Sequence, residues 1–216
     1  MTEPCSMLHQ WVNALDRFDF TFDKARIPLN GLYILFEKGE TAHCLDRIVR
    51  VGTHTGNNQL SSRLVQHFLN ENKDRSIFRK NIGRCFLNRD NDPVLKEWNL
   101  DLTKKEAKEK YLHLIDFEKQ REIEKKVSQY IQSNFSFAVI QLEDKKKRLD
   151  LESKMISTIS LCNEHSPSEN WLGKFSPKKK ICESGLWLVN ELEKEPLSNS
   201  DMIELHDIIN KEQCLM

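Results

Sequence analysis

The chain has 216 residues, of which 38% are hydrophobic and 31% charged, and its 33 basic and 33 acidic side chains give a formal net charge of zero. This length supports one substantial core, and the neutral balance argues against a protein that coats nucleic acid, because such affinity grows with the number of phosphates neutralised. No apolar run approaches the roughly 18 residues of a membrane span, and the first residues lack the basic and apolar segments of a signal peptide, so we expect a cytoplasmic protein without a membrane partner.

The first half of the sequence predicts helices around a pair of strands. Apolar periodicity and flanking Gly, Asn and Pro residues place these elements. The predicted elements are a helix over 6–17, strands over 32–36 and 47–51, a helix over 59–69 and a short basic helix over 74–83. Because a polar stretch, 37–46, separates the two strands, we expect a hairpin with a long loop.

The second half predicts a third strand among further helices. The elements are a polar insertion with short helices over 88–115, a helix over 118–133, a strand over 135–140, and helices over 145–161, 178–192 and 200–209. We therefore expect an α+β fold with a small mixed three-stranded sheet and flanking helices. It forms a single domain over residues 1–216, with a core at about 30–175, a helical insertion at about 88–132 and C-terminal helices over 178–210.

A carboxylate stands out on the helix predicted over 145–161. At about 100° per residue, Glu152 falls at the centre of an arc that includes Leu149, Met155 and Ile156. An uncompensated carboxylate there costs several kcal/mol, so it needs a partner. Two partners remain open at this point: a metal ion, or a buried arginine or lysine.

Six cysteines are scattered through the sequence with no C-x-x-C pair. This spacing argues against a structural zinc site and favours reduced thiols. Histidines and cysteines such as His43, Cys44, His54, Cys162 and His165 match no zinc-binding pattern, so core or surface roles are expected for them.

Several short motifs follow one another in a defined order. The two strands carry Gly31-Leu32-Tyr33 and Arg50-Val51-Gly52, the next helix carries Arg63 and His67 one turn apart, and Glu152 and Asn170 come later. This order, over about residues 30–175, resembles the GIY-YIG nuclease superfamily. The Arg-x-x-x-His spacing and the later asparagine look most like its restriction-endonuclease branch. The family's second tyrosine falls at Arg50, which leaves Tyr33 as the candidate to meet a nucleophilic water.

The resemblance implies a site for phosphodiester hydrolysis. Glu152 would hold one Mg²⁺, for which Mn²⁺ can substitute, beside the scissile phosphate. Arg63 would contact phosphate oxygens through its planar guanidinium, and Arg50 would add positive charge. His67 would accept a proton from Tyr33 or orient it, and Asn170 would position Glu152, the metal or the phosphate.

Each of these residues also has an ordinary structural interpretation. Tyr33 fits a half-buried sheet position, and Arg63 and His67 lie at the edge of an apolar helical arc, where such side chains are often structural. Asn170 fits a turn. His54, just after Gly52, either contacts phosphate or shapes its loop.

The leading functional hypothesis is a Mg²⁺-dependent endonuclease acting on double-stranded DNA in restriction or defence. Homing and repair members usually carry further domains that this sequence lacks. The DNA backbone would follow Arg75, Arg79, Lys80 and Lys146, and the insertion would serve sequence readout or dimer contacts in a homodimer. The alternative is a catalytically inactive module of the same fold that binds DNA or a protein, which Arg50 favours. A helical interaction protein without a nucleic-acid role is a third hypothesis.

Overall fold

A computed structural model describes residues 4–213, with side chains described to residue 211. Its sheet contains β1 (Gly31–Ala42), β2 (Leu45–Gly52) and β3 (Phe135–Gln141) in the order β2-β1-β3. Both neighbouring pairs are antiparallel. The α+β class with flanking helices is confirmed, but the expectation of a mixed sheet is wrong. The chain enters β3 beside Glu37 and leaves it beside Gly31, so β3 must run against β1.

The β1–β2 hairpin is longer and tighter than predicted. The strands continue to Ala42 and resume at Leu45, and His43 and Cys44 form a two-residue turn with φ values of 51° and 62°. The stretch 37–46 looked like a loop because it is polar. Its glutamates are nevertheless buried within the strand, and Glu40 pairs with Arg47 at 2.6 Å.

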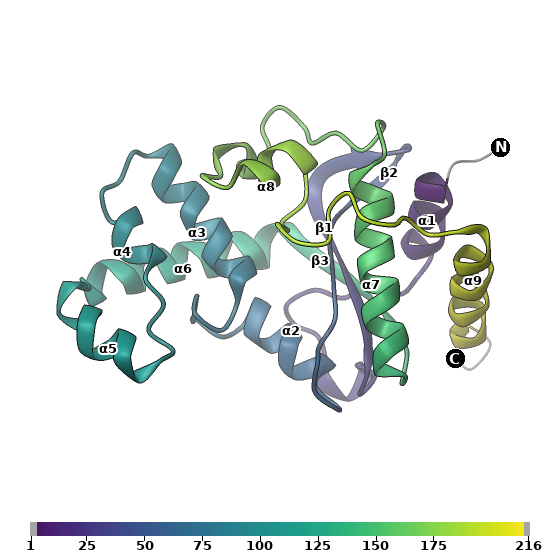
Figure 1. The fold of residues 1–216 in the computed structure, drawn as a ribbon, viewed down its shortest axis with the longest axis horizontal. Helices are drawn as coiled ribbons and strands as arrows, with labels where there is room; N and C mark the ends of the chain where they lie inside the picture. Colours follow the sequence, from purple (N-terminus) through teal and green to yellow (C-terminus); the bar gives the residue numbers. More distant parts are fainter. Residues whose placement is uncertain (1–3, 214–216) are drawn as a thin grey trace.

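Both faces of the sheet are covered, which explains the unbroken apolar run in β1. Leu32 and Ile34 point to one face, where they pack with helices α1 (Pro4–Asn13), α7 (Lys145–Ser160) and α9 (Asn199–Gln213) (Figure 1). Tyr33 and Leu35 point to the other face. There they pack with α2 (Leu60–Phe68), α3 (Ile77–Arg89) and α6 (Phe117–Asn134).

The remaining helices are short. They are α4 (Leu95–Asn99), α5 (Lys105–Tyr111) and α8 (Lys179–Ser184), with 3-10 turns η1 (Lys24–Arg26), η2 (Leu112–Leu114) and η3 (Leu172–Phe175). The helices predicted over 6–17, 59–69, 118–133, 145–161 and 200–209 all lie at the expected places, with shifted ends. Within the described residues, no helix is long and apolar enough to cross a membrane.

Two helices differ from their predictions. The basic helix begins at Ile77 rather than 74, because the Ser76 side chain caps it by accepting from the Arg79 N–H, and it continues to Arg89. The helix predicted over 178–192 ends at Ser184, because Gly185 adopts a left-handed conformation with φ 68°. The chain then runs beside β2, where the Trp187 N–H donates to the Val49 carbonyl.

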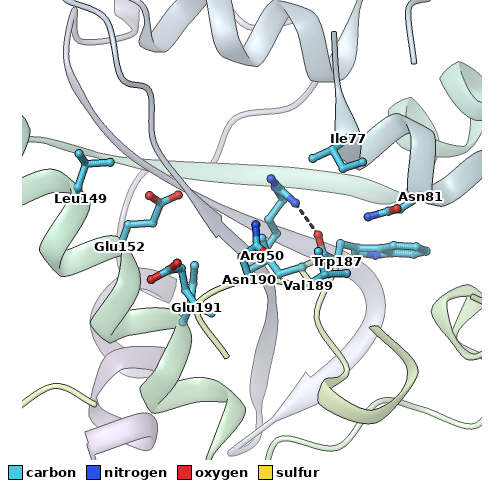
Figure 2. Close-up of a pocket in the computed structure, with 11 residues that line it drawn as sticks. Arg50, Ile77, Asn81, Leu149, Glu152, Trp187, Val189, Asn190 and Glu191 are labelled. Atoms are coloured by element: carbon cyan, nitrogen blue, oxygen red, sulfur yellow. Dashed lines mark hydrogen bonds between the residues drawn. The ribbon is translucent and has the colours of Figure 1, made fainter. Parts of the chain in front are cut away.

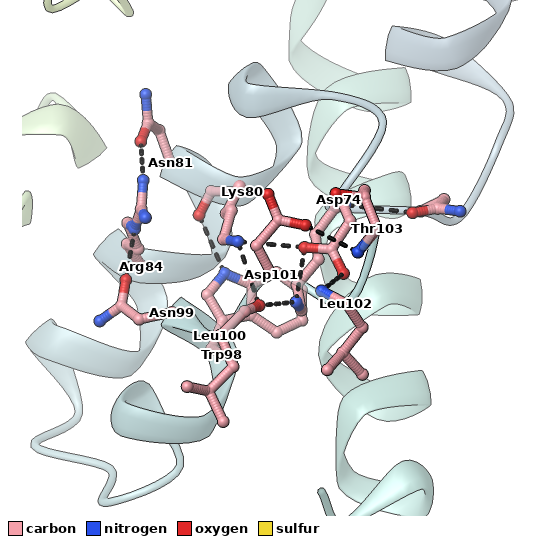
Figure 3. A network of polar contacts seen from close by, with 12 residues as sticks. Asp74, Lys80, Asn81, Arg84, Trp98, Asn99, Leu100, Asp101, Leu102 and Thr103 are labelled. Carbon is pink, nitrogen blue, oxygen red and sulfur yellow. Dashed lines mark hydrogen bonds and ion pairs between the residues drawn. The ribbon is translucent and has the colours of Figure 1, made fainter. Parts of the chain in front are cut away.

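The predicted insertion is helical but is not an appendage throughout. Ile123, Val127 and Ile131 of α6 belong to the core beneath the sheet. The segment around α4 is held by a polar network, in which Lys73 and Lys80 both contact Asp74 Oδ1 and the Leu100 carbonyl (Figure 3). The α4–α5 part lies at the opposite end of the molecule from α1 and α9 (Figure 1).

Candidate active site

A buried chain of hydrogen bonds links the first strand to α2. Tyr33 Oη lies 2.8 Å from His67 Nε2, and His67 Nδ1 lies 2.7 Å from Ser76 Oγ. Both rings are buried, since Tyr33 is 1% exposed and His67 is fully enclosed. The structure therefore brings together two of the predicted site residues, Tyr33 and His67. It adds Ser76, which the sequence spacing did not place next to His67.

His67 is kept in its neutral form. Burial is the main cause that lowers its pKa well below the ordinary value, and the charges of Arg63, Arg50 and Arg79 lower it further. A neutral imidazole has one donor and one acceptor nitrogen. It therefore suits the orientation of a hydroxyl better than the storage of a proton.

Gly52 is required by its closeness to Tyr33. A Cβ atom at this position would overlap the phenol oxygen and the ring carbon that bears it. The two residues are direct partners across β1 and β2. Gly52 of the second motif thus leaves the space that Tyr33 of the first motif occupies.

Arg50 occupies the position where the family's second tyrosine was expected. Its Nη1 donates to the Trp187 carbonyl (Figure 2), and its Nε lies 3.4 Å from Tyr33 Oη. Only 5% of the residue is exposed. The guanidinium is therefore held in place beside the tyrosine hydroxyl.

Glu152 lies on α7 at the border between the core and a pocket. Its Oε1 accepts the Thr53 backbone N–H at 3.0 Å. Burial raises the pKa of this carboxyl above its usual value, against the opposing effects of Arg50 and the Thr53 N–H; a neighbouring carboxylate, Glu191, adds to the rise. The helix buries Leu151, whereas Leu149 is 36% exposed, so the apolar stripe is displaced from the arc that the sequence indicated.

The pocket beside Glu152 has a volume of about 420 Å³. Arg50, Glu152, Asn190 and Glu191 lie near one another in it, as Figure 2 shows, and Asn81 and Trp187 also line it. Two carboxylates and an amide offer the oxygen ligands that Mg²⁺ prefers. This donor set fits a divalent metal.

Asn190 and Glu191 were missed by the sequence analysis. They lie in the irregular segment after α8, where Glu191 has a left-handed φ of 63°. Glu191 Oε2 accepts from Ser153 Oγ at 2.6 Å, which attaches the segment to α7 next to Glu152. The sequence indicated this segment only through Gly185, which lies within the helix predicted over 178–192 and is of a residue type that often ends a helix.

Arg63 lines a second, adjacent pocket with His54 and Thr53. Its Nη1 donates to Gln66 Oε1 and to the Arg75 carbonyl. Because Thr53 contacts Glu152, it lies between the two pockets. The ring nitrogens of His54 contact the Gly31 N–H and the Gly56 carbonyl. His54 therefore shapes the loop in which it lies, which is one of the two interpretations given for it above.

Asn170 lies elsewhere. It is exposed, next to the buried Trp171, whose indole N–H donates to Glu37. Glu37 pairs with Phe135, at the end of the β1–β3 ladder away from Gly31. Asn170 does not line the pocket of Glu152, whereas Asn190 and Asn81 do.

The four predicted DNA-backbone contacts divide into two pairs. Arg75 and Lys146 are exposed. Arg79 is fully buried and pairs with Glu124 at 2.9 Å, and Lys80 is 5% exposed and pairs with Asp74 at 3.0 Å. The prediction that Arg79 and Lys80 follow a DNA backbone is therefore wrong, because their charges are used inside the fold.

A family model of the GIY-YIG domain matches residues 5–214, nearly the entire chain. The protein therefore belongs to the GIY-YIG family, whose members are nucleases that typically use a divalent metal. No match was found among curated proteins or among solved structures.

Proposed function

We propose that this protein is a metal-dependent endonuclease that hydrolyses phosphodiester bonds in double-stranded DNA. The observation that carries the proposal is that Arg50, which donates to the buried Tyr33 hydroxyl, lines the same pocket as Glu152. In that pocket, Glu152 is within reach of a second carboxylate and an amide. Family membership supports nuclease chemistry, and the exposed Arg75 and Lys146 support binding of a phosphate backbone.

Tyr33 is the group that meets the attacking water. We assign His67 the neutral tautomer in which Nε2 accepts from the Tyr33 hydroxyl and Nδ1 donates to Ser76 Oγ, since both pairs of atoms lie within hydrogen-bond distance. In this arrangement one lone pair of Tyr33 Oη accepts from Arg50 Nε, and the other is left to receive a hydrogen bond from the water. His67 acts as a positioning residue, because its lowered pKa disfavours a second proton on the ring.

Arg50 and Arg63 supply the positive charge that phosphate hydrolysis needs. Preorganised donors stabilise the extra negative charge that develops on the phosphate oxygens. Arg50 is fixed by the Trp187 carbonyl and Arg63 by the Arg75 carbonyl, so neither has to be ordered when the substrate binds.

Glu152, Asn190 and Glu191 would hold the metal, for which Mg²⁺ is the expected ion and Mn²⁺ a substitute. When bound, such an ion offsets charge on the phosphate and assists the leaving oxygen. The raised pKa of Glu152 is consistent with this role, because burial, its main cause, disfavours a carboxylate charge that a bound cation would offset.

A role in restriction or defence is the biology that we favour, and it rests on the Arg63–His67 spacing, because Asn170, the other residue of that resemblance, lies outside the Glu152 pocket. Cleavage of both strands suggests a homodimer. The insertion exposes three large apolar residues for such contacts, Leu112, Leu114 and Phe117, at 47%, 50% and 48%. The single domain over residues 1–216 is the unit that we propose to act.

The direct test is cleavage of plasmid and phage DNA with Mg²⁺ or Mn²⁺ by the native protein and by Glu152→Gln. We expect nicking or discrete fragments from the native protein and loss of both in the variant. If folded native protein binds these DNAs and cuts none of them, the inactive binding module that Arg50 favours replaces this proposal.

A further inference from the structure

A cluster of sulfur and imidazole groups lies outside the candidate active site. It joins Cys5 and His9 of α1, His43 at the β1–β2 turn and Cys162 just after α7. Ligand atoms of Cys5, His9 and His43 all lie within 4.8 Å of one another. These residues are distant in sequence, which is why the spacing gave no zinc pattern.

Three of the ligand-to-ligand distances in the cluster match those around a tetrahedral ion, and Cys162 joins the cluster through His43. Cys5 Sγ and Cys162 Sγ lie 3.4 and 3.6 Å from His43 Nε2, and Cys5 Sγ lies 3.7 Å from His9 Nδ1. Zinc binds sulfur at about 2.3 Å and nitrogen at about 2.0 Å, so neighbouring ligands of one ion are about 3.3–3.8 Å apart.

His43 has the surroundings of a metal-binding histidine. Its Nε2 faces the two sulfurs, and its Nδ1 lies 3.2 Å from Glu164 Oε2. A carboxylate on the second ring nitrogen fixes the tautomer that presents the first one to a metal. His43 also sits at a hairpin turn with its side chain only 5% exposed, where a turn residue would normally face solvent.

A third histidine, His165, lies next to the cluster. The buried His165 ring lies 5.4 Å from that of His9, and its Nδ1 has no hydrogen-bond partner. His9 itself must rearrange on binding, because its Nδ1 is 2.8 Å from the Cys5 carbonyl and its Nε2 is 3.3 Å from the Ile48 N–H.

We propose that Cys5, His9, His43 and Cys162 form a binding site for Zn²⁺ that connects α1, the β1–β2 turn and the end of α7. Thiolates and imidazoles prefer zinc to magnesium, so this site and the Glu152 pocket select different ions. Its role is structural, because four protein ligands leave no open position for a substrate. It holds α7, the helix that carries Glu152, against the hairpin that carries Tyr33.

The test is titration of the reduced, metal-free protein with Zn²⁺, and with Co²⁺ as a spectroscopic probe. We expect one Zn²⁺ per chain, a higher Tm, and a Co²⁺ spectrum with thiolate charge-transfer and tetrahedral bands. His43→Asn and Cys162→Ser should each lose the charge-transfer band or change it to that of fewer thiolates. Cys44→Ser, which alters the exposed neighbour of His43, should keep the spectrum, and so should Glu152→Gln.

The proposal is overturned if Co²⁺ gives no thiolate band with the native protein, or if the band survives unchanged in both His43→Asn and Cys162→Ser. Cysteine modification without metal separates misfolding from loss of a ligand, because a folded variant keeps the buried Cys85 unreactive. Neither result depends on DNA cleavage, so the zinc site and the proposed nuclease activity are tested independently.

Discussion

At the scale of single residues, the role that we propose for Glu152 in activity is opposed to its effect on stability. Burial raises its folded-state pKa above the ordinary 4.5. Ionisation therefore opposes folding, so the favourable contribution exists below the unfolded-state pKa and is lost as the pH rises through the folded-state pKa. Near pH 7 and without metal, the charge of the partly buried carboxylate therefore destabilises the folded protein.

We predict that Glu152→Gln abolishes metal-dependent cleavage yet stabilises the metal-free protein near pH 7 by on the order of 1 kcal/mol. The gain should disappear below about pH 4, where both states are protonated. Urea unfolding across this range measures it. Asp150→Asn, on the exposed side of the same helix, is the control, and a Glu152→Gln protein less stable than native near pH 7 would refute the argument.

Gly52 provides a second prediction at this scale. Gly52→Ala places a Cβ on Tyr33 Oη, so the phenol must leave its position beside His67. We expect a loss of cleavage of about 10²-fold or more, similar to that of Tyr33→Phe. At Gly56 the added Cβ meets only the end of the flexible Gln59 side chain. Gly56→Ala should therefore retain most activity in the same single-turnover assay, and equal losses in both alanine variants would argue against a role for the Tyr33 position.

At the scale of elements, the Arg79–Glu124 pair joins α3 to α6. Arg79 donates to the Glu124 carboxylate and to Ser128, and all three residues are buried. Removal of one partner leaves a buried charge without compensation, which costs about 3–5 kcal/mol. This contact makes α6 part of the fold rather than a detachable insertion.

We therefore predict that Arg79→Met lowers the free energy of unfolding by about 3–5 kcal/mol. Lys146→Met, at an exposed position on α7, should change it by less than about 0.5 kcal/mol. Lys146→Met should instead reduce the salt dependence of DNA binding by about one phosphate contact. Denaturant titration and DNA binding at several salt concentrations distinguish the two variants. A stable Arg79→Met protein with weakened DNA binding would instead support the assignment of Arg79 to the DNA backbone.

The elements show which features local sequence can predict. Tyr33, His67 and Glu152 could be placed on a strand or helix from the sequence, because the periodicity of each of these elements is visible there. The predicted hairpin loop is too long, because Glu37 and Glu40 are strand residues that accept hydrogen bonds from Trp171 and Ser168, which are distant in the chain. Arg79 and Lys80 were misassigned for the same reason: their acidic partners are not evident from spacing.

At the scale of the whole molecule, the site is completed by a segment without regular structure. Residues 186–191 follow the left-handed Gly185 and run beside β2, bringing Asn190 to the Glu152 pocket. No periodicity places such a segment, so the sequence indicated Asn170 instead. The cysteine–histidine cluster was overlooked similarly, since α1, the hairpin turn and the end of α7 meet only in the fold.

The central claim is that the catalytic pocket is the one formed by Arg50, Glu152, Asn190 and Glu191. The most direct measurement is Mg²⁺-dependent DNA cleavage by Asn190→Ala and Asn170→Ala beside the native protein. We predict a strong loss of cleavage for Asn190→Ala and near-native cleavage for Asn170→Ala, with both proteins folded. Loss of cleavage in Asn170→Ala together with native activity in Asn190→Ala would contradict it.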